Sequence, residues 1–348
     1  MSTELTPEQA LALESPVFVD LRSPSEFLKG SIPGAVNIPL LDDEEREVIG
    51  LIYRQDQQEA RFQGLSFVSP KLPEIAAQIE SMGDQGSPVL YCWRGGMRSR
   101  SLHELLLTIM APPIYRLGGG YKAYRNYVLG KLRDYEFSQP LFVLNGLTGT
   151  GKTEILAILN EMGAPVVDLE GLAGHRGSSF GHLGLPSPRR QKDFDGLLWN
   201  RLQELEGSPY LIMEGEGKKI GPIHLPDSIY QAILAGEHIL VTSPLKKRVE
   251  RLLGEYTPKT GLELEAVVKA IESLLKYLGR SKVEELTTLA REKQFHDLVS
   301  SLCVDYYDRL YIDAKPGKTP FILEVDSNDS KVAAQKINDY ITEEVIKR

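Results

Sequence analysis

The sequence of 348 residues has little cysteine and no long apolar run. Its two cysteines, Cys92 and Cys303, argue against a disulfide framework and for a reducing compartment. No apolar run is long enough to span a bilayer, and the first residues are polar and acidic, so we expect neither a membrane span nor a signal peptide. We therefore predict a cytoplasmic protein with no membrane partner.

An excess of positive charge is also lacking, because the formal net charge is -8 at pH 7. This charge argues against non-specific coating of nucleic acid, but it leaves room for a local basic face that binds one RNA. Basic residues do cluster, and a solvated helix face or loop is the ordinary interpretation of such clusters. They lie at 189–192, 218–219 and 246–251.

The chain does contain short apolar runs that alternate with helical stretches, twice in succession. Such alternation predicts mostly parallel sheets with helices on both faces, and the length suits two domains. We place the boundary in the polar segment 134–140, which gives domains 1–132 and 140–348. Strands are expected at 17–20, 88–91, 114–117, 141–144, 165–168, 210–214, 238–241 and 321–325, and helices at 72–82, 99–110, 121–133, 152–161 and within 262–310.

A cysteine opens a loop rich in glycine and arginine between an expected strand and an expected helix. A free thiol has a pKa of about 8.5 and reacts as the thiolate. The helix N-terminus, Arg94 and Arg98 favour a thiolate and any anion bound to it, such as a persulfide, perselenide or phosphoryl group. Cys92 is therefore the predicted catalytic residue, whereas Cys303 follows an apolar helical run and is expected in the core. The loop reads Cys92-Trp93-Arg94-Gly95-Gly96-Met97-Arg98-Ser99, and its two glycines let the backbone curl around an anion.

A complete Walker A motif lies at 146–153, between another expected strand and helix. Its amides should hold a diphosphate, Lys152 should neutralise that charge, and the Thr153 hydroxyl is the expected Mg²⁺ ligand. Candidate metal carboxylates are Glu214 or Glu216, with Asp168 as a second choice. The usual Walker B aspartate is missing, which weakens the case for nucleotide hydrolysis; no zinc-type site is expected. The predicted diphosphate-binding residues are Gly146, Thr148, Gly149, Thr150, Gly151, Lys152 and Thr153.

Two further segments, 175–181 and 214–221, combine small residues with polar and basic ones. Small residues permit close backbone approach, and the polar side chains can bind an anion or an RNA backbone. A glycine-rich surface loop is the plain alternative. The candidate tRNA or substrate contacts are His175, Arg176, Ser178, Ser179, Glu214, Lys218 and Lys219.

Most of the first 125 residues resemble the rhodanese domain family. Segments 19–27 and 30–39 resemble its N-terminal signature, and 118–124 resembles its C-terminal one. Asp20 and Arg22, in the first segment, are expected to organise the fold. The sequence departs from the family at Ser31, where histidine is usual, and in the five residues between Cys92 and Arg98, where four are usual. The longer spacing also occurs in cysteine phosphatases and suits a tetrahedral group, although Tyr91 replaces the histidine common before a phosphatase cysteine.

A cysteine loop of this sequence, joined to a P-loop domain that carries segment 175–181, closely resembles the tRNA 2-selenouridine synthases over essentially the full chain. The resemblance implies an α/β protein: a rhodanese-like parallel-sheet domain followed by a P-loop NTPase-like domain with a helical C-terminal region. It implies a selenotransferase and geranyltransferase acting on 2-thiouridine at wobble position 34 of tRNA. Selenophosphate would supply selenium, geranyl diphosphate would give an S-geranyl intermediate, and a selenophosphate-supplying enzyme would be a partner.

On this resemblance, the P-loop would hold geranyl diphosphate, and Arg94 and Arg98 would bind the phosphate of selenophosphate. Cys92 would either carry selenium as a perselenide or assist attack on the geranylated base. Trp93 would stack on a base, pack against the prenyl chain or belong to the core. No tightly bound cofactor is expected besides these co-substrates and Mg²⁺. The alternatives are a sulfurtransferase fused to a P-loop kinase or NTPase, a Cys-x5-Arg phosphatase, and a non-enzymatic RNA-binding module with a vestigial rhodanese fold.

Overall fold

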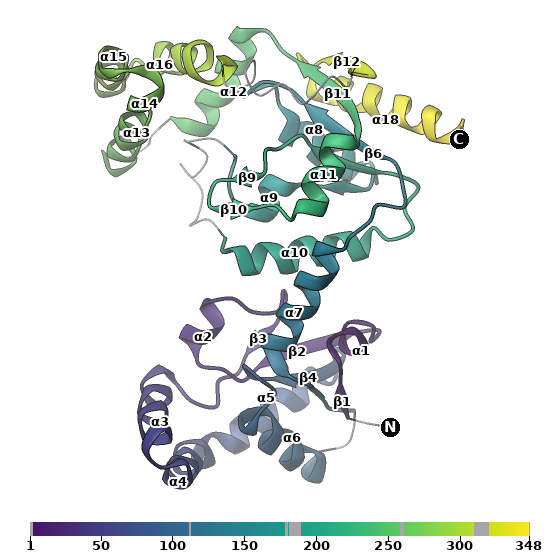
Figure 1. Ribbon diagram of the computed structural model, residues 1–348, viewed down its shortest axis with the longest axis vertical. Coiled ribbons are helices and arrows are strands. Elements are labelled where there is room, and N and C mark those ends of the chain that lie inside the picture. The colour runs from purple at the N-terminus through teal and green to yellow at the C-terminus, as the bar shows by residue number, and fades with distance from the viewer. Residues whose placement is uncertain are drawn as a thin grey trace. The chain divides into compact units, whose positions relative to one another are not determined.

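The computed structural model describes residues 3–110, 113–177, 180, 189–257, 261–309 and 320–347 (Figure 1). The chain divides into two compact units. The first is Met1–Lys131 with Asp195–Trp199, and the second is Leu132–Phe194 with Asn200–Arg348. Each unit contains its own five-stranded parallel sheet, so the expected α/β fold with parallel sheets is confirmed.

The first unit is built on a sheet of order β1-β5-β4-β2-β3, in which every neighbouring pair is parallel. In this register Asp20, the last residue of β2, lies opposite Tyr91, the last residue of β4. The segments that follow β2 and β4 therefore begin at the same edge of the sheet. The strands are β1 (Glu4–Leu5), β2 (Pro16–Asp20), β3 (Val36–Asn37), β4 (Ser87–Tyr91) and β5 (Tyr115–Leu117).

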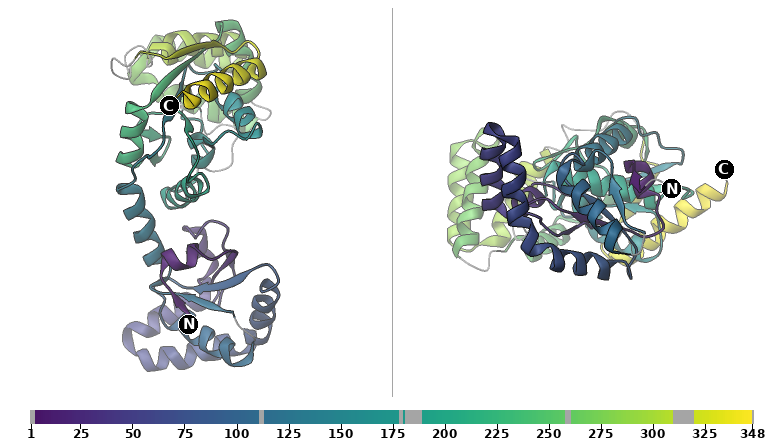
Figure 2. Two further views of the ribbon diagram at one scale, coloured as in Figure 1. Left: turned by 90° about the vertical axis from the view of Figure 1, so that its right-hand side faces the viewer. Right: turned by 90° about the horizontal axis from the view of Figure 1, so that it is seen from below.

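Helices surround this sheet in Figures 1 and 2, and an apolar core that includes Val19, Leu90 and Leu106 packs between β-strands and helices. The helices expected at 72–82 and 99–110 are α5 and α6, whereas α3 and α4 were not expected. The helix α3 begins after Asp42, which forms a capping box with Glu45. The helices are α1 (Pro7–Leu11), α2 (Pro24–Leu28), α3 (Asp43–Gln55), α4 (Gln57–Val68), η1 (Ser69–Lys71), α5 (Leu72–Met82), α6 (Met97–Ile109) and α7 (Gly120–Arg133).

The second unit has a parallel sheet of order β12-β11-β6-β8-β7, with β6 at its centre. Its apolar core packs the sheet against α8 and α18. Lys219, a candidate contact for tRNA or substrate, lies in a two-stranded antiparallel hairpin, β9 (Lys219–Ile220) and β10 (Ile223–His224). The other elements are β6 (Leu141–Asn145), α8 (Lys152–Glu161), β7 (Val166–Val167), α9 (Leu169–Ala173), α10 (Gln191–Glu204), β8 (Leu211–Glu214), α11 (Asp227–Ala235), β11 (Glu237–Thr242), α12 (Leu245–Tyr256), β12 (Leu323–Asp326) and α18 (Ser330–Ile346).

The helical region expected within 262–310 forms a separate apolar cluster in this unit. Cys303 is fully buried in a second, smaller cluster with Val249, Leu252 and Val299, which confirms the core assignment. Burial raises the pKa of the Cys303 thiol to about 11. No helix among the described residues is both long and apolar enough to cross a membrane. The helices are α13 (Gly261–Ser273), α14 (Leu275–Leu278), α15 (Arg280–Arg291) and α16 (Phe295–Leu302), followed by a π-helical turn, η2 (Cys303–Tyr307).

Candidate functional site

Cys92 follows β4 directly, and α6 begins five residues later at Met97 with Gly96 as its N-cap. The strand–loop–helix arrangement expected from the sequence is therefore confirmed. The Cys92 side chain is 3% exposed, and its Sγ lies 3.3 Å from the Ser99 hydroxyl on the first turn of α6. The hydroxyl and the helix N-terminus beside this sulfur are groups that can interact favourably with a bound anion.

The backbone of this loop is held by the glycine segment at the start of α7. The amide of Tyr121 donates to the carbonyl of Cys92 at 2.9 Å, and the amide of Lys122 donates to that of Trp93 at 2.9 Å. Gly120 has a φ of +60°, and a Cβ there would lie 2.2 Å from the Cys92 carbonyl oxygen. Only glycine fits such a position without moving the loop. Segment 118–124, part of the rhodanese-type signature, thus shapes the cysteine loop.

Asp20 and Arg22 form a fully buried ion pair at the same edge of the sheet, with 2.5 Å between Arg22 Nη2 and Asp20 Oδ2. The Arg22 guanidinium lies 4.3 Å from the ring centroid of Tyr121, and it also donates to the carbonyl of Gly30 at 2.8 Å. The ring of half-buried Trp93 packs 5.7 Å from that of Tyr121. These contacts support the expected role of Asp20 and Arg22 in organising the fold, and they place Trp93 at the edge of an aromatic cluster.

Arg98, expected to bind an anion, is already paired with a carboxylate. Its two terminal nitrogens donate to Glu26 of α2, at 2.7 and 3.3 Å. Arg46 of α3 reaches the same carboxylate, with 3.5 Å between Arg46 Nε and Glu26 Oε2. Burial alone would raise the pKa of Glu26, but the hydrogen bond and charge of Arg98 and the charge of Arg46 hold it below its usual value. Arg94 is exposed.

Glu26 and Arg46 are site residues that the sequence did not single out. Glu26 lies within the segment that resembles the rhodanese signature, so a signal for it was present. Arg46 lies on a helix with charges on several faces. Nothing in its local sequence indicates that Arg46 shares a carboxylate with Arg98 of the Cys92 loop.

The P-loop follows β6 and precedes α8, as the sequence predicts. Gly149 and Gly151 have positive φ values of 81° and 85°, which side chains rarely adopt. Lys152 Nζ donates to the carbonyl of Gly146 at 2.8 Å, so the lysine folds back over its own loop. The Thr153 hydroxyl donates to Glu170 Oε2 at 3.3 Å. The segment thus has the strand–loop–helix form that the Walker A motif predicts.

Side chains from distant segments brace this loop. Arg248 Nε donates to the carbonyl of Thr148 at 2.8 Å, and Arg248 pairs through both terminal nitrogens with Asp308. Ser327 donates to the carbonyl of Thr150 at 2.6 Å. Arg251 packs against Gly151. A solvated face was the ordinary interpretation of the basic cluster at 246–251, but Arg248 is 3% exposed and supports the P-loop instead.

Four carboxylates, those of Asp168, Glu170, Glu214 and Glu216, gather beside the P-loop. Glu214 is buried and accepts a hydrogen bond from the amide of Glu170 at 2.5 Å. A Cβ on Gly177 would lie 2.8 Å from Glu170 Oε1 and 2.9 Å from Glu216 Oε2, so these two carboxylates lie close together. Glu170 was not predicted, although it lies only two residues after Asp168 at the end of β7.

Burial opposes the ionisation of all four groups, and the charge of neighbouring carboxylates adds to it for Glu170 and Glu214. Burial, then the charge of Glu216, raises the pKa of Glu170 to about 8. Burial and the neighbouring carboxylates raise the pKa of Glu214 well above its usual value. Burial also raises the pKa values of Asp168 and Glu216. Mutual repulsion of this kind is relieved by a bound cation.

The described residues hold no group of three or more histidine, cysteine, aspartate or glutamate side chains with metal-binding geometry. Mg²⁺ at a phosphate site needs fewer protein ligands, because it keeps waters and uses the phosphates of the substrate. The hydroxyl of Thr153 and the carboxylate of Glu170, 3.3 Å apart, fit this need. Thr153 and Glu170 are therefore the residues that would hold Mg²⁺.

The two glycine-containing segments singled out in the sequence meet next to the P-loop. The ring of His175 lies against Gly221, where a Cβ would come within 2.5 Å of it, and His175 is 6% exposed. His175 and the buried Glu214 are thus packed inside the unit rather than presented to a large ligand. Arg176 is half-buried.

The basic side chains of the second segment, 214–221, are more exposed to solvent. Lys218 and Lys219 are exposed, and Lys218 forms an ion pair with Asp227 at 2.7 Å. They remain candidates for contact with RNA. Ser178 and Ser179 lie outside the described residues.

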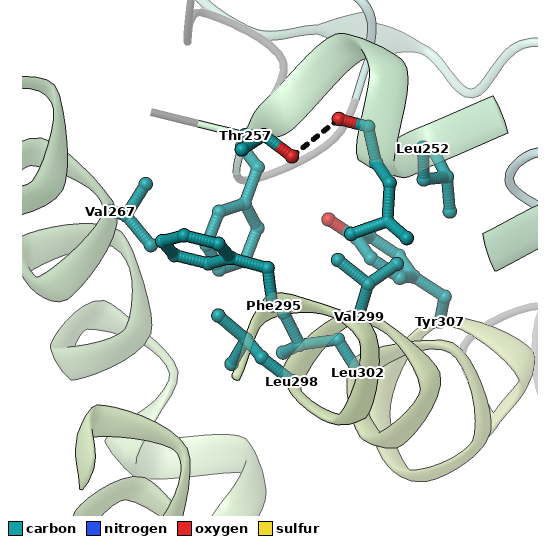
Figure 3. A pocket seen from close by; sticks show the side chains of 10 residues that line it. Leu252, Thr257, Val267, Phe295, Leu298, Val299, Leu302 and Tyr307 are labelled. Carbon is teal, nitrogen blue, oxygen red and sulfur yellow. Dashed lines mark hydrogen bonds between the residues drawn. The ribbon is translucent and has the colours of Figure 1, made fainter. Parts of the chain in front are cut away.

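A small apolar cavity of about 30 Å³ lies between α12, α13 and α16 (Figure 3). One of its walls, Leu252, also packs on the P-loop, because a Cβ on Gly149 would lie 3.0 Å from Leu252 Cδ1. The Thr257 hydroxyl in the wall is bonded to the Leu253 carbonyl at 2.6 Å. The cavity suits an apolar group, and a longer chain would need its walls to part. Its lining includes Leu252, Val267, Phe295, Leu298, Val299 and Leu302.

Two protein-family models match this chain. A rhodanese-like domain family matches residues 6–127, and the family described as the tRNA 2-selenouridine synthase AAA domain matches residues 139–344. A shikimate kinase from Acinetobacter baumannii in complex with shikimate, a solved structure, is 16% identical, with a TM-score of 0.26, over 60% of this chain and 95% of that chain. The fold and the two loops define a rhodanese-like domain joined to a P-loop domain.

Curated relatives extend the match across both domains. A tRNA 2-selenouridine synthase from Sulfurovum sp. (strain NBC37-1) is 37% identical over 75% of this chain and 72% of its own length. Those from Cupriavidus pinatubonensis (strain JMP 134 / LMG 1197) and Pseudomonas fluorescens (strain Pf0-1) are 34% and 31% identical, over 86% and 92% of this chain and 89% and 95% of their own lengths. This chain belongs to the tRNA 2-selenouridine synthase family, and it is an enzyme.

Proposed function

We propose that this enzyme converts 2-thiouridine at wobble position 34 of tRNA into 2-selenouridine, with selenophosphate as the selenium donor and an S-geranyl intermediate. Family membership supports the overall conversion. The observation that carries the two-step route is the presence, in one chain, of an enclosed thiol at Cys92 and a complete P-loop at 146–153. Each of these two loops would bind one phosphorylated co-substrate.

In the first step the P-loop would hold the diphosphate of geranyl diphosphate. The sulfur of 2-thiouridine attacks the first carbon of the geranyl group, the carbon–oxygen bond breaks, diphosphate leaves with the electron pair, and N3 of the base loses its proton to solvent. Lys152, the loop amides and the N-terminus of α8 stabilise the negative charge that develops on the leaving group. Mg²⁺ held by Thr153 and Glu170 would supply further positive charge there.

The geranyl chain would extend toward the apolar cavity behind Leu252. That wall touches Gly149 of the P-loop, so an apolar chain attached to a bound diphosphate has apolar surface within reach. Ten carbons fill more than the roughly 30 Å³ seen here, so α12 and α16 would separate on binding. Val299→Phe, which fills the cavity, should raise KM for geranyl diphosphate, whereas unchanged KM would place the chain elsewhere.

In the second step selenium replaces the alkylated sulfur. Geranylation turns a poor leaving group into a thiol that departs readily. The selenium of selenophosphate attacks carbon 2 of the base, the carbon–sulfur bond breaks, and geranyl thiol leaves. Water then attacks phosphorus, and the phosphorus–selenium bond breaks to release phosphate. The loop at 92–99 would bind the phosphate group, and Cys92 would assist the attack; a perselenide on Cys92 is the alternative.

Nucleoside mass spectrometry of thiolated tRNA tests this division. With geranyl diphosphate alone the enzyme should form S-geranyl-2-thiouridine, and with both donors 2-selenouridine. Cys92→Ala should abolish selenium incorporation but leave geranylation. Lys152→Ala should lower geranylation by about 100-fold, while Lys276→Ala, on exposed α14, serves as the matched control.

Other outcomes would replace the proposal. Loss of the same single step in both variants would end the division of roles. Sulfur transfer from thiosulfate to cyanide with ATP turnover and no need for tRNA would favour a sulfurtransferase fused to a kinase. Release of phosphate from simple phosphomonoesters by Cys92 would favour the phosphatase. The cytoplasm is the proposed location, and a selenophosphate-supplying enzyme is the proposed partner.

A further inference from the structure

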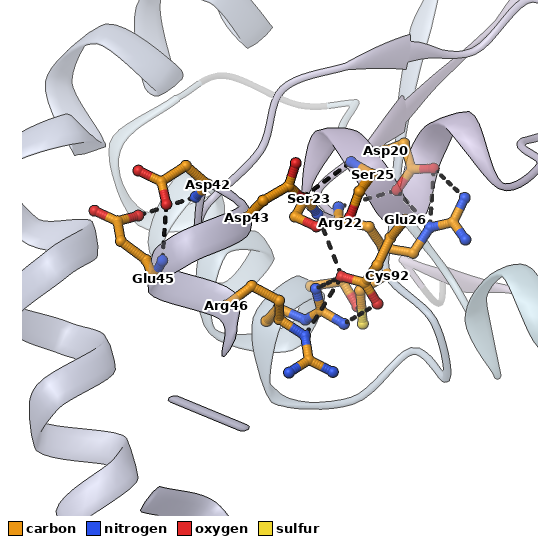
Figure 4. Close-up of polar contacts among 12 residues, drawn as sticks. Asp20, Arg22, Ser23, Ser25, Glu26, Asp42, Asp43, Glu45, Arg46 and Cys92 are labelled. Carbon is orange, nitrogen blue, oxygen red and sulfur yellow. Dashed lines mark hydrogen bonds and ion pairs between the residues drawn. The ribbon is translucent and has the colours of Figure 1, made fainter. Parts of the chain in front are cut away.

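Arg46 has no role in the steps above, yet it reaches the same carboxylate as Arg98 of the Cys92 loop. Figure 4 shows Arg46 extending from α3 toward Glu26. The Arg46 Nε lies 3.5 Å from Glu26 Oε2, and Arg98 Nη1 lies 2.7 Å from the same oxygen. Arg98 directly precedes Ser99, whose hydroxyl is 3.3 Å from the Cys92 sulfur. Arg46 is thus linked to the thiol through three side-chain contacts and the peptide bond between Arg98 and Ser99.

The position of Arg46 is fixed by the way α3 is attached. Asp43, at the start of α3, accepts a hydrogen bond from the amide of Ser25 at 3.0 Å, which ties α3 to α2. Arg46 lies one turn further along α3, and Glu26 directly follows Ser25. The attachment therefore brings Arg46 to Glu26 without help from any ligand.

The charges of the two arginines around Glu26 favour the binding of an anion. Glu26 carries one negative charge, whereas Arg46 and Arg98 carry two positive ones, so a positive charge is left over. Asp43 of α3 is also negative, and its carboxylate is bound to the serines of segment 23–25. Among the residues that the structure describes, no hydrogen bond is made by the terminal nitrogens of Arg46, whose side chain is 40% exposed. Arg98, by contrast, uses both terminal nitrogens on Glu26.

We propose that Arg46 is a second cationic residue that binds the tetrahedral oxyanion delivered to Cys92, and that Glu26 holds Arg46 and Arg98 together until that anion arrives. The identity of the anion as a phosphoryl group bearing selenium rests on the proposed function. The planar guanidinium of Arg46 can donate two parallel hydrogen bonds to two oxygens of such a group, as arginine does to carboxylates and phosphates in other proteins. Arg46 therefore sets the affinity for the donor rather than the chemistry at Cys92.

The direct test is calorimetric titration with inorganic thiophosphate. All proteins carry Lys152→Ala, so that the P-loop contributes little to binding. Arg46→Gln should weaken binding about tenfold, which corresponds to about 1.4 kcal/mol, and Arg46→Lys should restore part of it because it keeps the charge but loses the planar guanidinium. Arg54→Gln removes the same charge from an exposed position of the same helix and should leave affinity unchanged.

A kinetic test uses the otherwise unaltered enzyme. Arg46→Gln should raise KM for selenophosphate about tenfold and change kcat less than about twofold. Thiophosphate binding as tight in Arg46→Gln as in the parent would overturn the inference, and so would equal losses in Arg46→Gln and Arg54→Gln. If tRNA gains no selenium with any protein while thiophosphate binding still depends on Arg46, the proposed function fails and this inference stands.

Discussion

The Cys92 loop and the P-loop each follow a buried strand of a parallel sheet and precede a helix, but the charges around them have opposite signs. Arg46 and Arg98 outnumber Glu26 at the first loop. At the second, Lys152 lies close to Glu170 and Glu216, two of four carboxylates whose pKa values are raised. The first loop can receive an anion with its own side chains, whereas the second needs an added cation to receive a diphosphate.

The two loops are also supported differently. Backbone contacts from Tyr121 and Lys122 and the buried Asp20–Arg22 pair support the cysteine loop. Side chains from distant segments, chiefly Arg248, support the P-loop. A defect in the first support should therefore disturb the fold of its unit, and a defect in the second should mainly disturb ligand binding.

The largest effect is expected from Arg22→Ala. It leaves Asp20 buried without its partner, which typically costs about 3–5 kcal/mol. Arg248→Ala should cost less, about 1.5–3 kcal/mol, because its partner Asp308 is partly exposed. Urea unfolding followed in each variant checks the difference, with exposed Arg54→Ala as the control. Equal losses for Arg22 and Arg248 would remove the distinction between the two supports.

A pair of glycines in α7 gives the next largest effect. Gly120→Ala places a Cβ 2.2 Å from the Cys92 carbonyl at a φ of +60°, so it should destabilise the first unit by about 1–3 kcal/mol and abolish selenium incorporation while geranylation persists. Gly130 lies in the same helix with nothing near its Cβ position. Gly130→Ala should stabilise the unit by about 0.5–1 kcal/mol. Thermal unfolding and nucleoside analysis check both; full selenation by the first variant would contradict the expectation.

The pH dependence of the free energy of unfolding tests the difference in charge between the Cys92 loop and the P-loop. The pKa of Glu170 is raised to about 8 in the folded chain, above the ordinary value of 4.5, so ionisation opposes folding. Its contribution to stability is present at low pH and is lost as the pH rises from about 4.5 to about 8. Glu170→Gln should flatten this decline, and Mg²⁺ should stabilise the parent more at pH 8.5 than at pH 6.

Urea unfolding across this range, with and without Mg²⁺, measures the effect. Glu161→Gln, at an exposed position of α8, is the control and should keep the decline. An identical pH dependence in the parent and Glu170→Gln would show that the carboxylate cluster does not oppose folding.

The smallest effect concerns tRNA. Lys219→Glu reverses an exposed charge and should weaken tRNA binding a few-fold and reduce the salt slope by about 1. Lys218→Glu should have a smaller effect, because Asp227 already pairs with Lys218. Filter binding at several salt concentrations, with Lys276→Glu as control, checks the order. Binding that is indifferent to both reversals would remove them from the candidate contacts.

The sequence alone predicts the parts of each site that depend on local patterns. Cys92 and Lys152 each belong to a segment that links an apolar strand to a helix, and the glycines in each segment mark a loop. The arrangement of both residues could therefore be predicted. Arg46, Glu170 and Arg248 could not be assigned a role. An arginine on a charged helix has the same local sequence whether it is solvated or buried, and only tertiary packing brings it to a loop.

The burial of Cys303 has a consequence for how a loaded Cys92 is discharged. Many enzymes that carry a sulfur or selenium atom on one cysteine release it by attack from a second thiolate. Within these 348 residues the only other thiol is Cys303, which is inaccessible and has a pKa of about 11. A thiolate that discharges an adduct on Cys92 must therefore come from another molecule, so that step depends on the concentration of an external thiol.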